Sequence, residues 1–164
     1  MLSKLSLTFG SRQILQDIID KYPDRKFKLM QASEHSHNLA LFDFSNKPTV
    51  FKSPVEYTVL GEQLDSEYRG ILYYQSFQVD NDHQKILFNT LNKIIDNSNP
   101  LVNGQAFFQV DNKEESTTLV LLTALNDLDE LMAWKKTDAF KQLDSFTTRD
   151  PNNTYYDEVY RPLM

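Results

Sequence analysis

The residues most able to do chemistry lie in a short segment that holds the only tryptophan of the chain. Residues 131–140 read LMAWKKTDAF. The pattern predicts that one helix ends just after Trp134 and a second begins at Thr137–Asp138, because threonine and aspartate are favoured N-cap residues. The indole of Trp134 then either fills the core or forms the wall of a pocket for a flat ligand. Helical spacing alone leaves both interpretations open.

A second candidate is an amide on a predicted strand. Residues 69–79 (RGILYYQSFQV) are rich in aromatic and β-branched residues, and strand alternation puts Tyr73, Gln75 and Phe77 on one face. A buried glutamine needs a hydrogen-bond partner, since an unmet polar group costs about 1–3 kcal/mol. We interpret Gln75 as either a ligand contact or a satisfied core amide. An apolar pocket could be lined by Tyr73, Tyr74, Gln75, Phe77, Phe107, Phe108 and Trp134, unless alternate members face two separate layers.

The three histidines favour structural roles. His35 and His37 have a weak metal-ligand spacing, but no third ligand lies close by, so we expect a polar turn and predict no metal site. His83 is expected on the surface, at the start of a helix.

Acidic clusters also have structural interpretations. Asp127, Asp129 and Glu130 fit the capped first turn of a helix. Asp157 and Glu158 fit outward positions of a last strand.

Composition excludes several classes of function. The chain has 164 residues and no cysteine, which rules out disulfides, thiolate metal sites and cysteine nucleophiles. Its net charge of −6 falls entirely on residues 66–164, and no basic patch suggests a nucleic-acid partner. Only four glycines are present and no phosphate-binding loop is visible. No membrane span or signal peptide is recognisable, so we expect a cytoplasmic protein without integral membrane contact.

The candidate residues are positioned by strands and helices that follow a similar order in the two parts of the chain. Residues 66–164 predict strand, helix, strand, strand, helix, strand, which is the ferredoxin-like βαββαβ order. The expected elements are a strand over 69–79, a helix over 83–96, strands over 105–110 and 117–125, helices reaching Trp134 and starting at Asp138, and a strand over 155–160.

Residues 1–65 repeat this order in degenerate form. The expected elements are a strand over 5–9, a helix capped by Ser11, strands over 26–32 and 38–44, and a helical turn with a last strand within 54–64. No linker separates the two runs. We therefore expect an α+β chain in which two ferredoxin-like units, 1–65 and 66–164, pack closely and mimic a dimer internally.

Three motifs carry a family resemblance. Phe51-Lys52-Ser53-Pro54 with Tyr57, then Trp134-x-x-Thr137-Asp138-x-Phe140, then Tyr155-Tyr156-x-x-Val159-Tyr160-x-Pro162 resemble the TRAP and HmoB type of the antibiotic-biosynthesis-monooxygenase (ABM) superfamily. The W-x-x-[ST]-D-x-F segment is the most specific of them. The resemblance implies a dimeric-type α/β barrel, with a pocket between sheet and helices.

The resemblance also implies site residues. In the heme-degrading members, a strand amide faces the iron-bound oxygen, a tryptophan distorts the heme and a histidine ten residues later is the axial ligand. Carried across, Trp134 matches the tryptophan, Gln75 falls near the amide position and Asp144 stands at the axial position. A carboxylate is an unusual ligand for heme iron. Tyr73 and Phe77 would contact the bound group.

These inferences leave two hypotheses. In the first, the chain is a monooxygenase-like protein, heme-degrading or cofactor-independent, that binds heme or another flat aromatic ligand. In the second, it is a non-enzymatic stress-response or regulatory protein with a closed pocket. The expected partner is a small hydrophobic or aromatic ligand, and the chain is expected as a monomer with an internal pseudo-dimer or as a homodimer.

Overall fold

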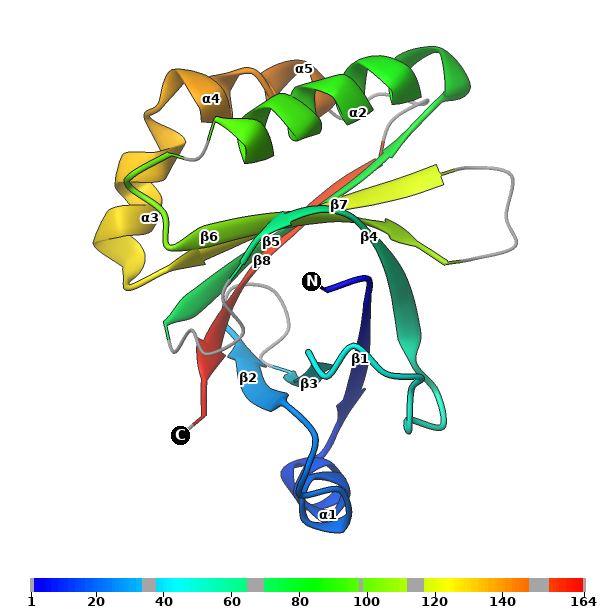
Figure 1. Cartoon of the computed structure of the whole chain (residues 1–164). Helices are drawn as coiled ribbons and strands as arrows, with labels where there is room; N and C mark the ends of the chain where they lie inside the picture. The colour runs from blue at the N-terminus through cyan, green and yellow to red at the C-terminus, as the bar shows by residue number, and fades with distance from the viewer. Residues whose placement is uncertain are drawn as a thin grey trace.

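The computed structural model describes residues 2–33, 38–64, 70–97, 99–111, 117–147 and 154–163. Eight strands close into an antiparallel barrel in the order β1-β3-β2-β8-β5-β7-β6-β4. Four helices pack on the outside of one half of this barrel and a fifth lies under the other half (Figure 1).

The C-terminal half contains the more complete unit. Its elements are β5 (Ile71–Val79), α2 (Asn81–Asp96), β6 (Gly104–Val110), β7 (Thr117–Leu125), α3 (Leu128–Lys135), α4 (Asp138–Lys141), α5 (Asp144–Thr147) and β8 (Thr154–Pro162). The strands run in the order β8-β5-β7-β6, with every predicted element present. The helix α5 lies in a segment for which the sequence pattern predicted nothing.

The N-terminal half repeats the strand order. Its elements are β1 (Lys4–Gly10), α1 (Arg12–Lys21), β2 (Phe27–Ala32), β3 (Leu39–Asp43) and β4 (Val55–Gln63), and the strands run β4-β1-β3-β2. The helical turn expected within residues 54–64 is wrong, because Val55–Gln63 is a strand throughout. Both of its edges are paired, one with β1 and the other with β6.

The two halves join edge to edge. Ala32 of β2 pairs with Tyr160 of β8, and Tyr57 of β4 pairs with Val110 of β6. The fourth strand of each half thus meets the second strand of the other, which closes the barrel. The α+β fold of ferredoxin-like units forming a dimeric-type α/β barrel within one chain is confirmed. The domain division between residues 65 and 66 falls outside the described residues and stays a prediction.

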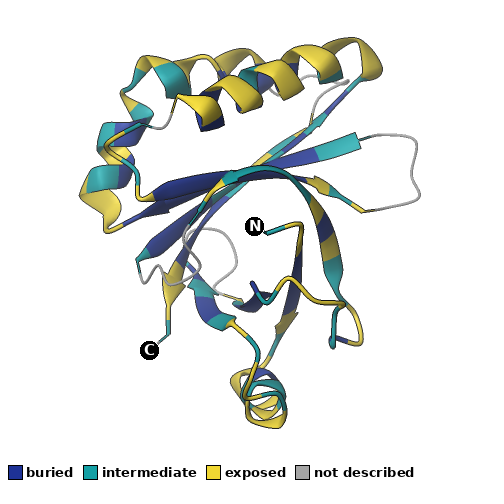
Figure 2. Cartoon of the chain, viewed as in Figure 1, coloured by how far each residue is buried: buried dark blue, intermediate teal, exposed yellow. Residues whose placement is uncertain are grey.

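Strand alternation sorts the buried side chains into three layers. The lumen cluster fills the barrel and draws on all eight strands, for example through Leu7, Phe42 and Tyr160. The helix-side layer lies between the outer face of the C-terminal strands and α2–α5, and contains Trp134. A smaller cluster around Leu15 packs α1 against the N-terminal half. The strands β6 and β7 are consequently buried on both faces along most of their length (Figure 2).

Three helices begin at residues whose side chains cap them, and Ser11 and Asp127 were predicted to do so. The side chains of Ser11, Asp80 and Asp127 accept hydrogen bonds from the first turns of α1, α2 and α3. Among the described residues, no helix is both long and apolar enough to cross a membrane.

Candidate functional site

The helix-side layer brings together four of the five residues singled out from the sequence. Tyr73 and Phe77 of β5 and Trp134 of α3 belong to one packed cluster, and Gln75 lies between Tyr73 and Phe77 on the same strand face. The predicted alternation of β5 is confirmed, since Tyr74 faces the lumen cluster instead. Phe107 and Phe108 separate in the same way, into the helix-side layer and the lumen.

The side-chain amide of Gln75 is fully buried, and only its nitrogen is hydrogen-bonded within the described structure. Its Nε2 donates to the hydroxyl of Tyr155 over 3.0 Å. Its Oε1 is buried and has no hydrogen-bond partner within the described part of the chain. An amide oxygen in such a setting loses its hydration without replacement, which costs about 1–3 kcal/mol. Gln75 is therefore only half satisfied.

Trp134, on the helix side of the same layer, also has a buried polar atom without a hydrogen-bond partner among the described residues. Its side chain is 0% exposed, and its Nε1 finds no acceptor among the residues that the structure describes. The backbone around it is held firmly, because the Thr137 hydroxyl donates to the Trp134 carbonyl over 2.7 Å and also caps α4. Phe140 packs edge-on against the indole at 6.1 Å. The indole N–H is thus held in place without an acceptor in the described part of the chain.

A polar network continues from Gln75 along β5 and β8. The Tyr73 hydroxyl donates to Asp157 Oδ2 over 2.6 Å, and the Tyr155 hydroxyl donates to the same oxygen over 3.2 Å. Lys135 lies 5.0 Å from the centre of the Tyr73 ring. Burial is the main cause that raises the pKa of Tyr155 to about 12, and it raises the pKa of Tyr73 further. Both phenols therefore remain protonated donors at neutral pH.

Sequence reasoning missed Tyr155 and Asp157 as members of this group. Asp157 pairs with Gln75, and Tyr155 with Phe77, in the β5–β8 register. Two residues that lie directly opposite each other on paired strands have their side chains on the same face of the sheet. The only available signal was the tyrosine-rich alternation of residues 155–160, which does not reveal its partner strand.

The outward placement expected for Glu158 is wrong. Its side chain is 0% exposed and lies on the lumen face of β8, between Tyr156 and Tyr160. Glu158 is buried because its face of β8 is turned into the closed barrel, where Tyr160 belongs to the lumen cluster. Asp157 is half-buried on the opposite face, within the network described above.

Asp144 is the fifth predicted site residue. It is exposed at the first position of α5. The residues of this segment that are buried in the helix-side layer are Leu143 and Phe146, at 0% and 4% exposure. Apolar side chains thus occupy the part of the layer nearest to the predicted axial position.

Of the three histidines, His83 is the one that lies in the described part of the chain. His83 is exposed in the first turn of α2, as predicted, where its ring lies 2.6 Å from the Asp80 carboxylate and lowers the pKa of Asp80. His35 and His37 lie outside the described residues. The cap interpretation of the α3 acids is confirmed, since Asp127 accepts from the Glu130 amide over 2.9 Å.

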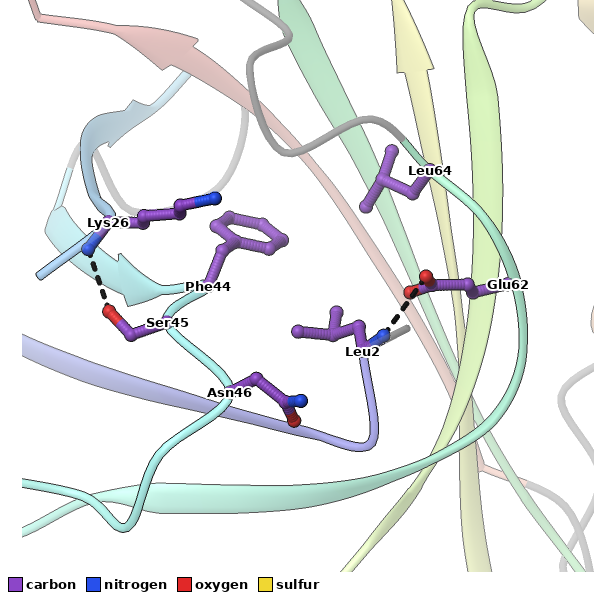
Figure 3. A pocket seen from close by; sticks show the side chains of 7 residues that line it. All are labelled: Leu2, Lys26, Phe44, Ser45, Asn46, Glu62 and Leu64. Atoms are coloured by element: carbon purple, nitrogen blue, oxygen red, sulfur yellow. Dashed lines mark hydrogen bonds between the residues drawn. The ribbon is translucent and has the colours of Figure 1, made fainter.

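Two cavities lie at the two ends of the barrel. One of about 210 Å³ opens between the start of β1 and the end of β4, where Glu62 and Lys26 are among its walls (Figure 3). Glu62 accepts a hydrogen bond from the Leu2 amide over 3.1 Å. Another, of about 380 Å³, is lined by tyrosines of the lumen. Neither includes Gln75 or Trp134 in its lining.

Solved structures share this architecture over their whole length. A major regulator of staphylococcal pathogenesis has 20% sequence identity and a TM-score of 0.74, covering 98% of this chain and 99% of that one. The Listeria monocytogenes heme-degrading enzyme LmHde has 13% identity and a TM-score of 0.74, covering 96% and 98%. A ferredoxin-fold protein related to antibiotic biosynthesis monooxygenases, from the same species, has 13% identity and a TM-score of 0.74, covering 100% and 96%.

These neighbours are proteins of the kind that the sequence motifs resemble, and at such identities the likeness establishes the fold. No family model matches the chain.

Proposed function

We propose, from a fold shared with ABM-related proteins, that this chain is a monooxygenase-like protein that binds a flat aromatic ligand in the helix-side layer. The ligand would lie between β5 and the α3–α5 segment, in contact with Trp134 and Gln75. The observation that carries the proposal is the pair of buried, unpartnered polar atoms, Trp134 Nε1 and Gln75 Oε1, within one apolar layer of the described structure.

The chemistry of these two atoms defines the ligand. The indole Nε1 is only a donor and the amide oxygen is only an acceptor. A planar molecule that offers one carbonyl or phenolate oxygen and one hydroxyl would satisfy both atoms. Tyr73 and Phe77 would supply the apolar surface on either side of Gln75. Such a combination of apolar walls and few polar groups is typical of small-molecule sites.

Heme is the flat ligand that the fold suggests, but the residues present do not fit its iron. Asp144 is exposed, and Leu143 and Phe146 are the buried residues of that segment. Within the described part of the layer, no imidazole faces the sheet. We therefore derive no chemistry through iron, and treat a porphyrin as a ligand held by its ring alone.

Trp134 makes the proposal directly testable, because the only tryptophan of the chain lies at the site. Purified protein is titrated with anthrone, protoporphyrin IX and hemin, and the tryptophan fluorescence is followed. We expect quenching by at least one of these ligands. We also expect similar affinities for hemin and protoporphyrin IX, because the iron gains no protein ligand. A hemin-specific Soret shift together with much tighter hemin binding would contradict that second expectation.

Gln75→Leu tests whether the quenching reports this site. The substitution keeps the approximate volume but removes the amide, so we expect about tenfold weaker binding from one lost hydrogen bond. Gln109→Leu, at an exposed glutamine of β6, is the matched control and should bind as the unchanged protein does. Equal affinity in all three proteins would remove Gln75 from the site.

A specific observation also favours the second hypothesis. Tyr73, Gln75, Phe77 and Trp134 are all at most 1% exposed, so a ligand can enter only if α3–α5 move away from the sheet. If none of the three ligands quenches Trp134, the result supports a non-enzymatic stress-response or regulatory protein with a closed layer.

A further inference from the structure

A cavity in the barrel lumen, on the other side of the sheet from Trp134, has features of a separate binding site. Its volume is about 380 Å³, and its lining includes Phe9, Tyr57, Tyr74, Ser76, Tyr156 and Tyr160. By strand alternation these side chains all belong to the lumen face of their strands. The cavity is reached from the end of the barrel where Phe9 and Tyr156 are 49% and 41% exposed.

The tyrosine rings that line this cavity are steeply inclined to one another. Tyr74 lies edge-on to Tyr156, with ring centres 6.5 Å apart at 68°, and edge-on to Tyr160, at 6.1 Å and 85°. The hydroxyls of Tyr57 and Tyr74 are 2.9 Å apart and hydrogen-bonded. This bond holds the ring of Tyr57, the fourth tyrosine, in place beside Tyr74. Several aromatic faces that converge at steep angles are typical of sites for alkylated ammonium groups, because each ring presents a negative face to the cation.

A buried carboxylate adds negative charge next to these rings. Glu158 is 0% exposed, lies between Tyr156 and Tyr160 on the lumen face of β8, and pairs with Tyr74 in the β5–β8 register. Its Oε2 accepts from the Tyr156 hydroxyl over 3.5 Å. In the low-dielectric lumen, a carboxylate attracts a cation more strongly than it would in water.

Lysines of the lumen lie toward the other end of the barrel. Lys26 lines the cavity of about 210 Å³ between β1 and β4 (Figure 3). Lys28 precedes Ala32 by four residues on β2, and Ala32 is the partner of Tyr160. A strand rises about 3.3 Å per residue, which puts Lys28 roughly 13 Å along the barrel from Tyr160 and farther still from Glu158. Among the described residues, the tyrosine end of the lumen is therefore the end that lies away from these lysines.

We propose that this tyrosine-lined cavity binds a small organic cation, of the trimethylammonium or protonated amine class. The charged group would lie among Tyr74, Tyr156 and Tyr160, with Glu158 behind them. The site is separate from the helix-side layer because strand β5 lies between the two. Ligands could therefore occupy both, and neither proposal requires the other.

The probe is choline, compared with its tert-butyl analogue, in which a carbon atom replaces the nitrogen. The two molecules have nearly the same shape and differ in charge. Binding to the full chain is measured by isothermal titration calorimetry and by saturation-transfer NMR. We expect choline to bind at least about tenfold more tightly than the neutral analogue, since the ring faces and Glu158 act only on the charge. Equal affinities, or no binding of choline at millimolar concentration, would overturn the proposal.

Tyr156 provides a matched pair of variants at the exposed rim of the cavity. Tyr156→Phe keeps the ring and should retain most of the choline affinity, whereas Tyr156→Leu removes the ring and should weaken it about fivefold. Equal affinities of the two variants would argue against an aromatic wall.

Glu158→Gln keeps the shape of the side chain and removes its charge, so choline binding should weaken while the tert-butyl analogue is unaffected. Circular dichroism and thermal melting establish that each variant is folded before binding is measured. If Glu158→Gln does not fold, the Tyr156 pair and the comparison with the analogue still decide the question. Trp134→Phe, in the other layer, is the control and should leave choline binding unchanged.

Discussion

The hydroxyl of Tyr73 donates to Asp157 Oδ2 over 2.6 Å, across the β5–β8 pair and beneath the helices that cover it. This short bond joins a fully buried phenol to a carboxylate that also accepts from Tyr155 over 3.2 Å. Gln75 extends the chain of hydrogen bonds by donating to Tyr155. Four polar side chains of the helix-side layer are thus connected, and the chain of hydrogen bonds ends at the Gln75 amide oxygen, which has no partner among the described residues.

Tyr73→Phe should destabilise the protein measurably. The substitution removes one donor to a partly buried carboxylate and leaves the aromatic packing in place, so we expect a loss of about 1–3 kcal/mol in the free energy of unfolding. Urea unfolding followed by Trp134 fluorescence measures the change. Tyr22→Phe, at the end of α1 and away from this network, is the control and should change the free energy little. A loss of equal size in both variants would argue that the Tyr73 hydroxyl makes no special contribution.

Stability should fall in alkaline solution because two tyrosine phenols have raised pKa values in the folded chain. Burial raises the pKa of Tyr155 to about 12, and burial together with Glu158 raises the pKa of Tyr156 to about 12, above the unfolded value of about 10. Between these values the unfolded chain has lost protons that the folded chain keeps. The stabilisation is therefore complete below about pH 10 and is lost as the pH rises toward 12.

Thermal melting across this range measures the effect. We expect a constant midpoint between about pH 7 and 9 and a decline above about pH 10. Tyr155→Phe should make the decline shallower, whereas Tyr22→Phe should leave the profile unaltered. A midpoint that stays constant up to pH 12 would contradict the raised pKa values.

Gly61 lies where β4 shifts its register against β6, and close packing there should exclude any side chain. A Cβ at Gly61 would come within 2.6 Å of the Phe107 ring, whereas a Cβ at Gly10 would meet its nearest side-chain atom at 3.5 Å. Gly61→Ala should force Phe107 to move and should cost about 1–3 kcal/mol, as overpacked cores do. Gly10→Ala should cost clearly less. Denaturant unfolding of both variants compares them, and equal losses would show that Phe107 adjusts freely.

The local pattern of the chain was sufficient for the order and type of most elements. Caps such as Ser11 and Asp127, and the alternation of residues 69–79, depend on interactions among residues close in sequence. The same local alternation correctly put Gln75 between Tyr73 and Phe77 on one face. Local reasoning also found the motif around Trp134, and the fold that its resemblance implied is shared with an ABM-related ferredoxin-fold protein.

Closure of the barrel could not be predicted from local sequence patterns, because it depends on strand pairs that are far apart in sequence. Ala32 meets Tyr160, and Tyr57 meets Val110, and no short-range pattern reveals either partner. The helical turn expected in residues 54–64 gave way to a strand because β4 is paired along both edges. Long-range pairing therefore overrode a weak local preference.

The sequence by itself determined the ferredoxin-like order of elements, the helix starts and the residue types at Gln75 and Trp134. Only the tertiary structure decided that Glu158 faces a closed lumen, that Asp157 joins Tyr73, and that Asp144 remains exposed. The physical reason is that the burial of a strand residue depends on what covers each face of the sheet. In a closed barrel, distant strands and helices supply that cover.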